Sequence, residues 1–162
     1  MLGALSDANG GAALTPDVTI IGIGNDFRRD DGVGPAVAER IAERGLPGVR
    51  VLTGISESTA LLDAWSGAAR VVVVDAVAGG DAAPGRIRRW TAADLQATKV
   101  VSSHTLGLTQ MCALGQALSQ MPDELVLFTV DVVDTNHGLG LTRAVAAALP
   151  GLVELILAEL SR

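Results

Sequence analysis

Short apolar runs alternate with amphipathic segments along most of the chain. Val18–Ile23 is a β-branched run, and four consecutive valines fill Val71–Val74, which is typical of strands covered on both faces. Apolar residues at helical spacing follow the first run, from Pro35 in a first helical turn to a stop at Gly45. The order strand, loop, helix predicts a parallel sheet with helices packed on it.

The same cycle repeats further along the chain. Additional strands are predicted at 49–52, 85–90 and 125–130, and additional helices over 61–67, over 106–118 and from 142 onward. Arginines flank Ile87, which indicates a more exposed edge strand, while Thr142 can cap a final helical region that Pro150 interrupts. We therefore expect an α/β fold, a three-layer α/β/α sandwich with a mostly parallel, about five-stranded twisted sheet.

One domain accounts for most of the chain. Residues 1–17 are rich in Gly, Ala and small polar residues without a period, which predicts a flexible N-terminal extension before a single domain at 18–162. A chain of 162 residues is long enough to bury a real core. The apolar runs are far shorter than the roughly 18 residues that a membrane span needs, so no membrane partner is expected.

Charge and cysteine content narrow the class of partner. Lys and Arg number 12 against 18 Asp and Glu, and the net charge of -6 disfavours nucleic acid and favours a metal or a cationic partner. The single cysteine, Cys112, cannot form an internal disulfide, and no secretory leader is evident. We expect a cytoplasmic monomer in which Cys112 is a core residue.

Three potential metal ligands lie next to the predicted strands. Asp31, Asp75 and His104 each come just after a run that is typical of a buried strand, and His104 also stands just before a predicted helix. The carboxyl ends of parallel strands open into one crevice, so these groups can converge there. Near a helix N-terminus imidazole tends to stay neutral, which is its ligating form. Two carboxylates and one imidazole suit nickel, zinc, manganese or iron, and the ligands alone leave the element open.

Each of these residues also has a structural interpretation. Asp30 or Asp31 can cap the first helix, and capping or solvation suits Asp30 better than ligation. Asp75 can brace the loop at 76–80, and a lone histidine such as His104 is more often structural than a ligand. His137, in a polar, glycine-rich loop, is assigned a structural or solvent role rather than ligation.

Two other kinds of site are disfavoured. Gly22 and Gly24 begin a dinucleotide-binding fingerprint, but Phe27 occupies the place of its third glycine and an acidic loop follows. Ser103 and His104 are adjacent in sequence, whereas a hydroxyl and its base need spatial convergence that neighbours seldom have. The sequence therefore argues against nucleotide binding and against serine catalysis.

Four motifs in one order carry a resemblance to a known family. The segments GIGNDFRRDDGVG, VVVVDAV, SSHTLGL and HGLGLT resemble those of the hydrogenase maturation endopeptidases, and the resemblance extends from Val18 over nearly all of the chain. It implies a nickel-dependent endopeptidase that removes a C-terminal extension from a [NiFe] hydrogenase large-subunit precursor after nickel insertion. The partner is then that precursor.

The resemblance also implies residue roles. It places the family's metal-binding and catalytic positions on Asp31, Asp75 and His104, with Asp31 standing where some members have Glu. Nickel is then supplied by the precursor, other divalent metals can substitute, and water attacks the peptide. Either aspartate can act as general base only when it is not fully engaged as a ligand.

Three alternatives to this function remain. The first is a metal-sensing or metal-delivery module that keeps the ligands but cuts nothing. The second is a nucleotide-binding module that uses Gly22 and Gly24, and the third is a structural relative whose acidic residues only cap helices.

Overall fold

The computed structural model describes residues 17–55, 58–79, 81–97 and 103–162, apart from the side chains of 58–59 and 103–107. Residues 1–16 of the predicted N-terminal extension lie outside the described residues. Within the described ranges, no helix combines the length and the apolarity that a membrane crossing requires.

Five strands form one sheet in the order β2-β1-β3-β5-β4. Neighbouring strands are parallel except for β4, which runs antiparallel to β5 and forms an edge. The strands are β1 (Val18–Ile23), β2 (Val49–Ile55), β3 (Arg70–Ala78), β4 (Ile87–Thr91) and β5 (Glu124–Val132). The prediction of a mostly parallel, five-stranded sheet with an arginine-bearing edge strand is confirmed.

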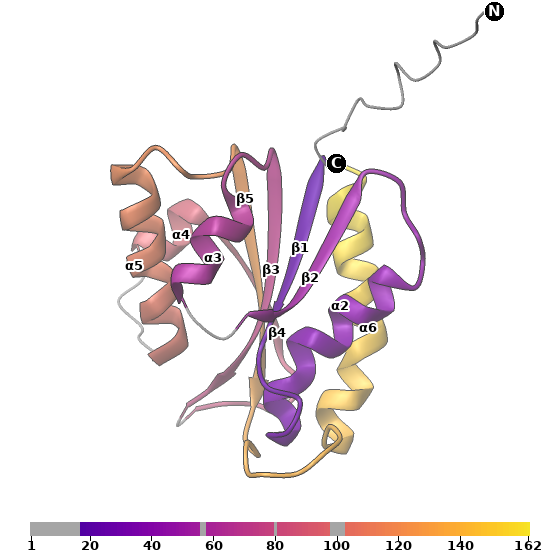
Figure 1. The fold of residues 1–162 in the computed structure, drawn as a ribbon. Helices are drawn as coiled ribbons and strands as arrows, with labels where there is room; N and C mark the ends of the chain where they lie inside the picture. The colour runs from indigo at the N-terminus through magenta and orange to yellow at the C-terminus, as the bar shows by residue number, and fades with distance from the viewer. Residues whose placement is uncertain (1–16, 56–57, 80, 98–102) are drawn as a thin grey trace, which may run out of the picture.

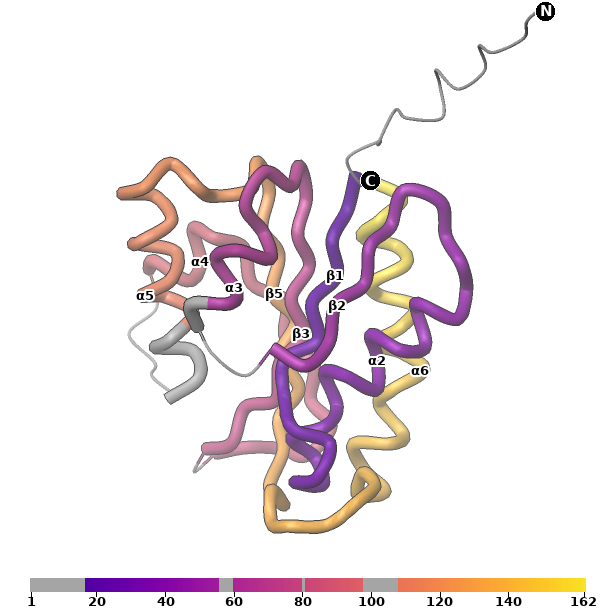
Figure 2. Tube along the Cα trace, in the orientation of Figure 1, coloured from indigo at the N-terminus to yellow at the C-terminus, as the bar shows by residue number. Residues whose placement is uncertain are grey.

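Helices cover both faces of this sheet, as Figures 1 and 2 show. The helices on one face are α2 (Val33–Ala42), which a 3-10 turn η2 (Arg29–Gly32) precedes, and α6 (Arg143–Leu160). Those on the other face are α3 (Ser58–Trp65), α4 (Ala92–Ala97) and α5 (Ser103–Ala117). The three-layer α/β/α architecture is confirmed.

The valines of β3 connect the two halves of the core. Val72 and Val74 pack in an apolar cluster with residues of α2 and α6, while Val71 and Val73 pack in a second cluster with residues of α3 and α5. All four are fully buried, because successive side chains of a strand point to opposite faces and both faces are covered. The run of valines therefore marks the centre of the sheet.

Two predicted elements need correction. The strand expected at Val71–Val74 is longer, since β3 continues to Ala78 and β5 pairs with it over its whole length. Helix α4 was not expected, although Thr91 and Asp94 exchange hydrogen bonds (3.2 and 2.9 Å) in a capping box that the sequence contains.

Pro150 does not interrupt the last helix. It lies inside α6, where it removes only the hydrogen bond to the carbonyl of Ala146, and both residues are exposed to water. Thr142 is the N-cap residue of α6, but its hydroxyl makes no capping bond within that helix.

Close backbone packing joins α2 to the sheet. A Cβ on Gly34 would lie 2.3 Å from the carbonyl oxygen of Ile23 and 2.7 Å from that of Val74. A Cβ on Gly22 would likewise lie 2.4 Å from the carbonyl oxygen of Gly34. Only glycine allows this approach, so the first turn of α2 rests on the ends of β1 and β3. The glycines of the first motif serve helix–strand packing.

Replacing Gly34 with alanine should destabilise the fold by about 2–3 kcal/mol, because two backbone carbonyls must move to admit one methyl group. Urea unfolding would measure the change. Gly151→Ala is the matched control, since Gly151 lies in the interior of α6 with open space beside it. There alanine should stabilise the protein by about 0.5–1 kcal/mol. Equal effects of the two substitutions would contradict the packing argument.

Candidate functional site

The candidate site lies at the carboxyl ends of β1 and β3. From β1 the chain passes through α2 to β2 on one side, whereas β3 lies on the other side of β1. Ligands of open α/β sheets bind where the strand order diverges in this way. Asp31, in η2, follows β1, and Asp75 belongs to β3.

Asp31 is held by the loop that leads to it. One of its carboxylate oxygens accepts a hydrogen bond of 2.9 Å from the backbone N–H of Asn25, and the side chain is half-buried. Gly24 has a φ of 143°, and a Cβ there would overlap the carbonyl oxygen of Asp31. The N-cap of α2 is Gly32, and no side chain caps it. The capping interpretation of Asp30 and Asp31 at this helix is therefore wrong.

Asp75 is a buried carboxyl group inside the strand. Its side chain is 6% exposed, and its Oδ1 accepts a hydrogen bond of 2.9 Å from the N–H of Ala76. Because β3 extends to Ala78, the bond between Asp75 and Ala76 lies within the strand. The prediction that Asp75 braces a loop at 76–80 is therefore wrong. The side chain alternates with Val74 and so faces the layer of α3 and α5.

Two causes raise the pKa of Asp75. Burial raises it from 3.8 to about 8, the N–H of Ala76 opposes this, and the charge of Asp31 raises it further. The charge of Asp31 therefore acts on the Asp75 carboxyl group, as the smallest of the three causes. At neutral pH the Asp75 carboxyl holds a proton. Among the described residues it forms no ion pair that would replace that proton.

His104 lies in the first turn of α5, whose N-terminal end points toward the carboxyl ends of the strands (Figure 1). That helix covers the face to which Asp75 points. The side chain of His104 is outside the described residues, so its convergence with the two aspartates stays a prediction. Among the side chains that the structure describes, no three of His, Cys, Asp or Glu are grouped to hold a metal ion.

Asp30 has a role that the sequence did not reveal. It is 1% exposed, and its two oxygens accept hydrogen bonds of 2.7 and 2.8 Å from the N–H and the hydroxyl of Thr142. Its own N–H donates to the carbonyl of Asp134. Asp30 thus satisfies the start of α6, a helix more than a hundred residues away, and ties η2 to it. No local pattern around Asp30 identifies that partner.

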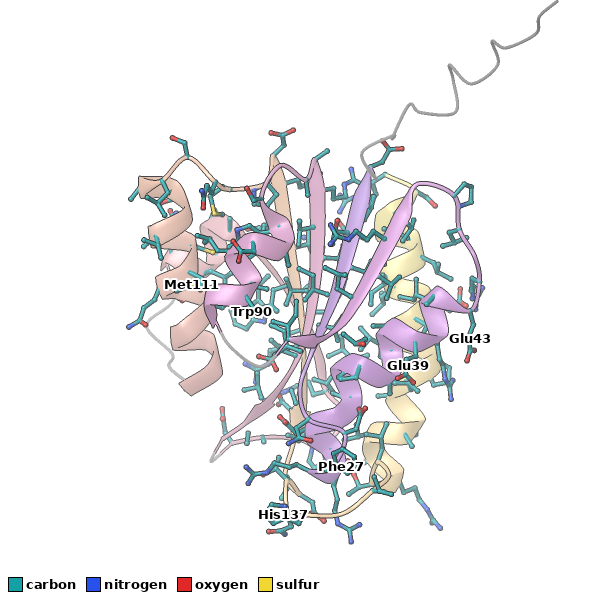
Figure 3. All side chains as sticks on the ribbon, in the orientation of Figure 1. Phe27, Glu39, Glu43, Trp90, Met111 and His137 are labelled. Carbon is teal, nitrogen blue, oxygen red and sulfur yellow. The ribbon has the colours of Figure 1, made fainter. Side chains whose placement is uncertain are left out.

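A second loop packs against the loop of Asp31. Gly138 forms a β-bridge with Arg28, donates its N–H to the carbonyl of Phe27 and accepts from the N–H of Arg29. His137 is exposed on this second loop, close to Phe27 at the same end of the molecule (Figure 3). The loop at 133–142 is thus hydrogen-bonded to the loop that carries Asp31.

The cysteine of α5 is not a candidate nucleophile. Cys112 is buried in the apolar cluster between the sheet and α5, and burial raises its pKa to about 11. Its thiol therefore stays protonated near neutral pH, whereas the thiolate is the reactive form. The prediction that Cys112 belongs to the core is confirmed.

Comparison with known proteins connects this arrangement to one family. The model of the family described as hydrogenase maturation protease matches residues 35–159. The hydrogenase 2 maturation protease of Escherichia coli (strain K12) is 26% identical over 147 residues, which are 88% of this chain and 90% of the relative. The hydrogenase expression/formation protein HupD of Rhodobacter capsulatus is 32% identical over 157 residues, 93% of this chain and 72% of the relative.

A solved structure shows the same fold. The hydrogenase maturating endopeptidase HybD from E. coli superposes with a TM-score of 0.75 at 24% identity, over 89% of this chain and 91% of that one. The family match spans Asp75 and His104 and begins four residues after Asp31.

Asp75→Asn should stabilise the protein at alkaline pH. The folded-state pKa of about 8 lies above the unfolded value of 3.8, so the wild type loses stability as pH rises through this interval. Asparagine keeps an oxygen for the N–H of Ala76 and carries no charge to bury. The melting temperature of the variant relative to the wild type should therefore rise by about 3 °C or more between pH 5 and pH 8.5.

Asp63→Asn, which changes an exposed carboxyl group of α3, is the matched control and should show no such trend. If the melting temperatures of Asp75→Asn and the wild type differ by the same amount at pH 5 and at pH 8.5, the burial argument is contradicted.

Proposed function

Because the chain belongs to the hydrogenase maturation protease family, we propose that this endopeptidase removes the C-terminal extension of a [NiFe] hydrogenase large-subunit precursor after nickel insertion. In this proposal Asp31, Asp75 and His104 bind the nickel that the precursor carries. The enzyme works as a cytoplasmic monomer. The observation that carries the proposal is a buried aspartate within β3, whose pKa the charge of the half-buried Asp31 after β1 helps to raise, in a protease of this family.

The chemistry of Asp75 supports a metal-bearing substrate. A buried carboxylate is costly unless a cation or a proton accompanies it. In the free enzyme the proton does so, as the pKa of about 8 indicates. Nickel arriving with the precursor would replace the proton, because a metal ligand must be deprotonated. The more exposed Asp31 would complete the carboxylate pair from the solvent side.

The protein's contribution to the reaction is then binding and orientation. A precursor held through its nickel places one peptide bond beside the two aspartates, and such positioning supplies a large part of a rate enhancement. Water is the attacking group in this proposal, and Cys112, which is buried and protonated, does not compete with it. One aspartate accepts a proton from this water while it is not fully engaged as a ligand.

The glycines of the first motif offer no support for nucleotide binding. The backbone carbonyl groups of Gly34 and Asp31 fill the space beside Gly22 and Gly24, so a phosphate has no room to bind there. The metal-delivery alternative differs from the proposal in one respect only, which is that it predicts binding without cleavage.

The first test compares two forms of the matching precursor. Purified enzyme is incubated with nickel-loaded and with nickel-free precursor, and mass spectrometry follows the C-terminus. We expect loss of the extension only from the loaded form, and no loss with His104→Ala. Cleavage of both forms alike would refute nickel-conditional recognition. Retained binding of the loaded precursor without any cleavage would favour the delivery module.

The second test separates two adjacent aspartates. Asp31→Ala should reduce cleavage at least about 100-fold while the free energy of unfolding changes by less than about 1 kcal/mol, because Asp31 accepts only one exposed hydrogen bond. Asp30→Ala should cost about 1–3 kcal/mol, because it leaves the N–H of Thr142 without its acceptor. At a temperature where it is folded, this variant should keep cleavage within about tenfold of the wild type. The reverse pattern would assign the roles to the wrong residues.

A further inference from the structure

The most exposed large apolar side chains of the described residues lie at one end of the sheet. Phe27, Val133 and Leu139 are 68%, 65% and 72% exposed, and we call these three residues the apolar rim. Phe27 belongs to the loop that leads to Asp31, and Val133 and Leu139 belong to the loop that is hydrogen-bonded to it. The other exposed large apolar residues are Leu114, Leu118 and Leu155, which are 40–52% exposed and lie on or next to α5 and α6.

The backbone beneath the apolar rim is well bonded. Phe27 accepts a hydrogen bond from Gly138, the residue before Leu139, at 2.9 Å, and its own N–H donates to the side chain of Asn25. Asp134, the residue after Val133, accepts from Asp30 at 3.2 Å. The exposure of these side chains is therefore built into the structure, and presenting them in fixed places reduces the entropy lost when a partner binds.

The charges beside the apolar rim are already engaged within the protein. The guanidinium of Arg28 donates to the carbonyl of Thr135 at 3.2 Å, and that of Arg29 lies 3.7 Å from the carboxylate of Asp134. The Arg29 charge thus faces a carboxylate, and the Arg28 guanidinium is held by a backbone carbonyl of the second loop. Apolar side chains flanked by polar groups are typical of a protein-binding surface.

We propose that the apolar rim is the docking surface for the precursor protein, which places apolar side chains of its own against Phe27, Val133 and Leu139. This inference rests on the proposed function. The position of the rim favours this occupant, because the backbone N–H of Asn25 donates to the carboxylate of Asp31 and its side-chain oxygen accepts from the N–H of Phe27. The rim and Asp31 therefore belong to one hydrogen-bonded loop, and a protein whose chain end lies at Asp31 has the rim beside it. A few residues usually carry most of the binding energy of a protein interface, and Phe27 has the largest apolar side chain of the three.

A paired-variant experiment tests the inference. In Phe27→Ser/Leu139→Ser, KM for the nickel-loaded precursor should rise about tenfold or more while kcat changes less than about threefold, because binding is lost and the aspartates are untouched. Leu118→Ser/Leu155→Ser, which removes two exposed leucines from elsewhere on the surface, is the matched control and should leave both constants unchanged. The single variant Phe27→Leu, which keeps an apolar side chain at this position, should have a KM close to that of the wild type.

The outcomes separate the inference from the proposed function. If the wild type cleaves the precursor and the rim variant has the same KM as the control variant, the docking surface is overturned and the proposed function stands. No cleavage by the wild type would overturn the function itself. Thermal melting checks that both double variants are folded, and the single variant Leu139→Ser replaces the double variant if it is not. A wild-type dimer in sedimentation that the rim variant dissociates would assign the rim to self-association and overturn the inference.

Discussion

The packing of the first turn of α2 on the ends of β1 and β3 is the constraint on which the candidate site depends. Gly34 lies between the carbonyl oxygens of Ile23 and Val74, at distances that leave no room for a side chain. This contact fixes where η2 runs, and therefore where the carboxylate of Asp31 lies relative to Asp75. If the helix lay even about 1 Å further out, the two carboxyl groups would move apart, and any ligand held between them would bind less tightly.

Asp75 shows how a functional group is kept at the expense of stability. An aspartate among the valines of a central strand loses its hydration, and its pKa rises to about 8 because no basic side chain of the described residues compensates. A structural role alone would be served better by an apolar residue. In the proposed function, a substrate that delivers a cation would neutralise this carboxylate and would link recognition of the precursor to the presence of metal. Sites of this kind commonly carry perturbed titratable groups.

Much of the fold and part of the site could be predicted. The alternation of strands and helices, the central position of the valine strand and the arginine-bearing edge all follow from local patterns, and the structure confirms them. The convergence of Asp31, Asp75 and His104 is expected from the rule that parallel strands end at one edge, and it stays a prediction. Helix α4 was missed although its capping box was present, and Pro150 was misjudged because apolar packing of Leu149 and Leu152 outweighs one lost hydrogen bond.

The sequence by itself determined the family and the periodic pattern of burial, because strand and helix periods are properties of neighbouring residues. Only the tertiary structure decided which distant groups meet. Asp30 and Thr142 are 112 positions apart, and the loop of Phe27 pairs with that of Gly138. The local sequence of either segment does not predict its partner, because a hydrogen bond between distant segments depends on how the helix and sheet layers pack. The sequence already favoured Asp31 over Asp30 as the candidate ligand, but only the packing showed that Asp30 ties η2 to the start of α6.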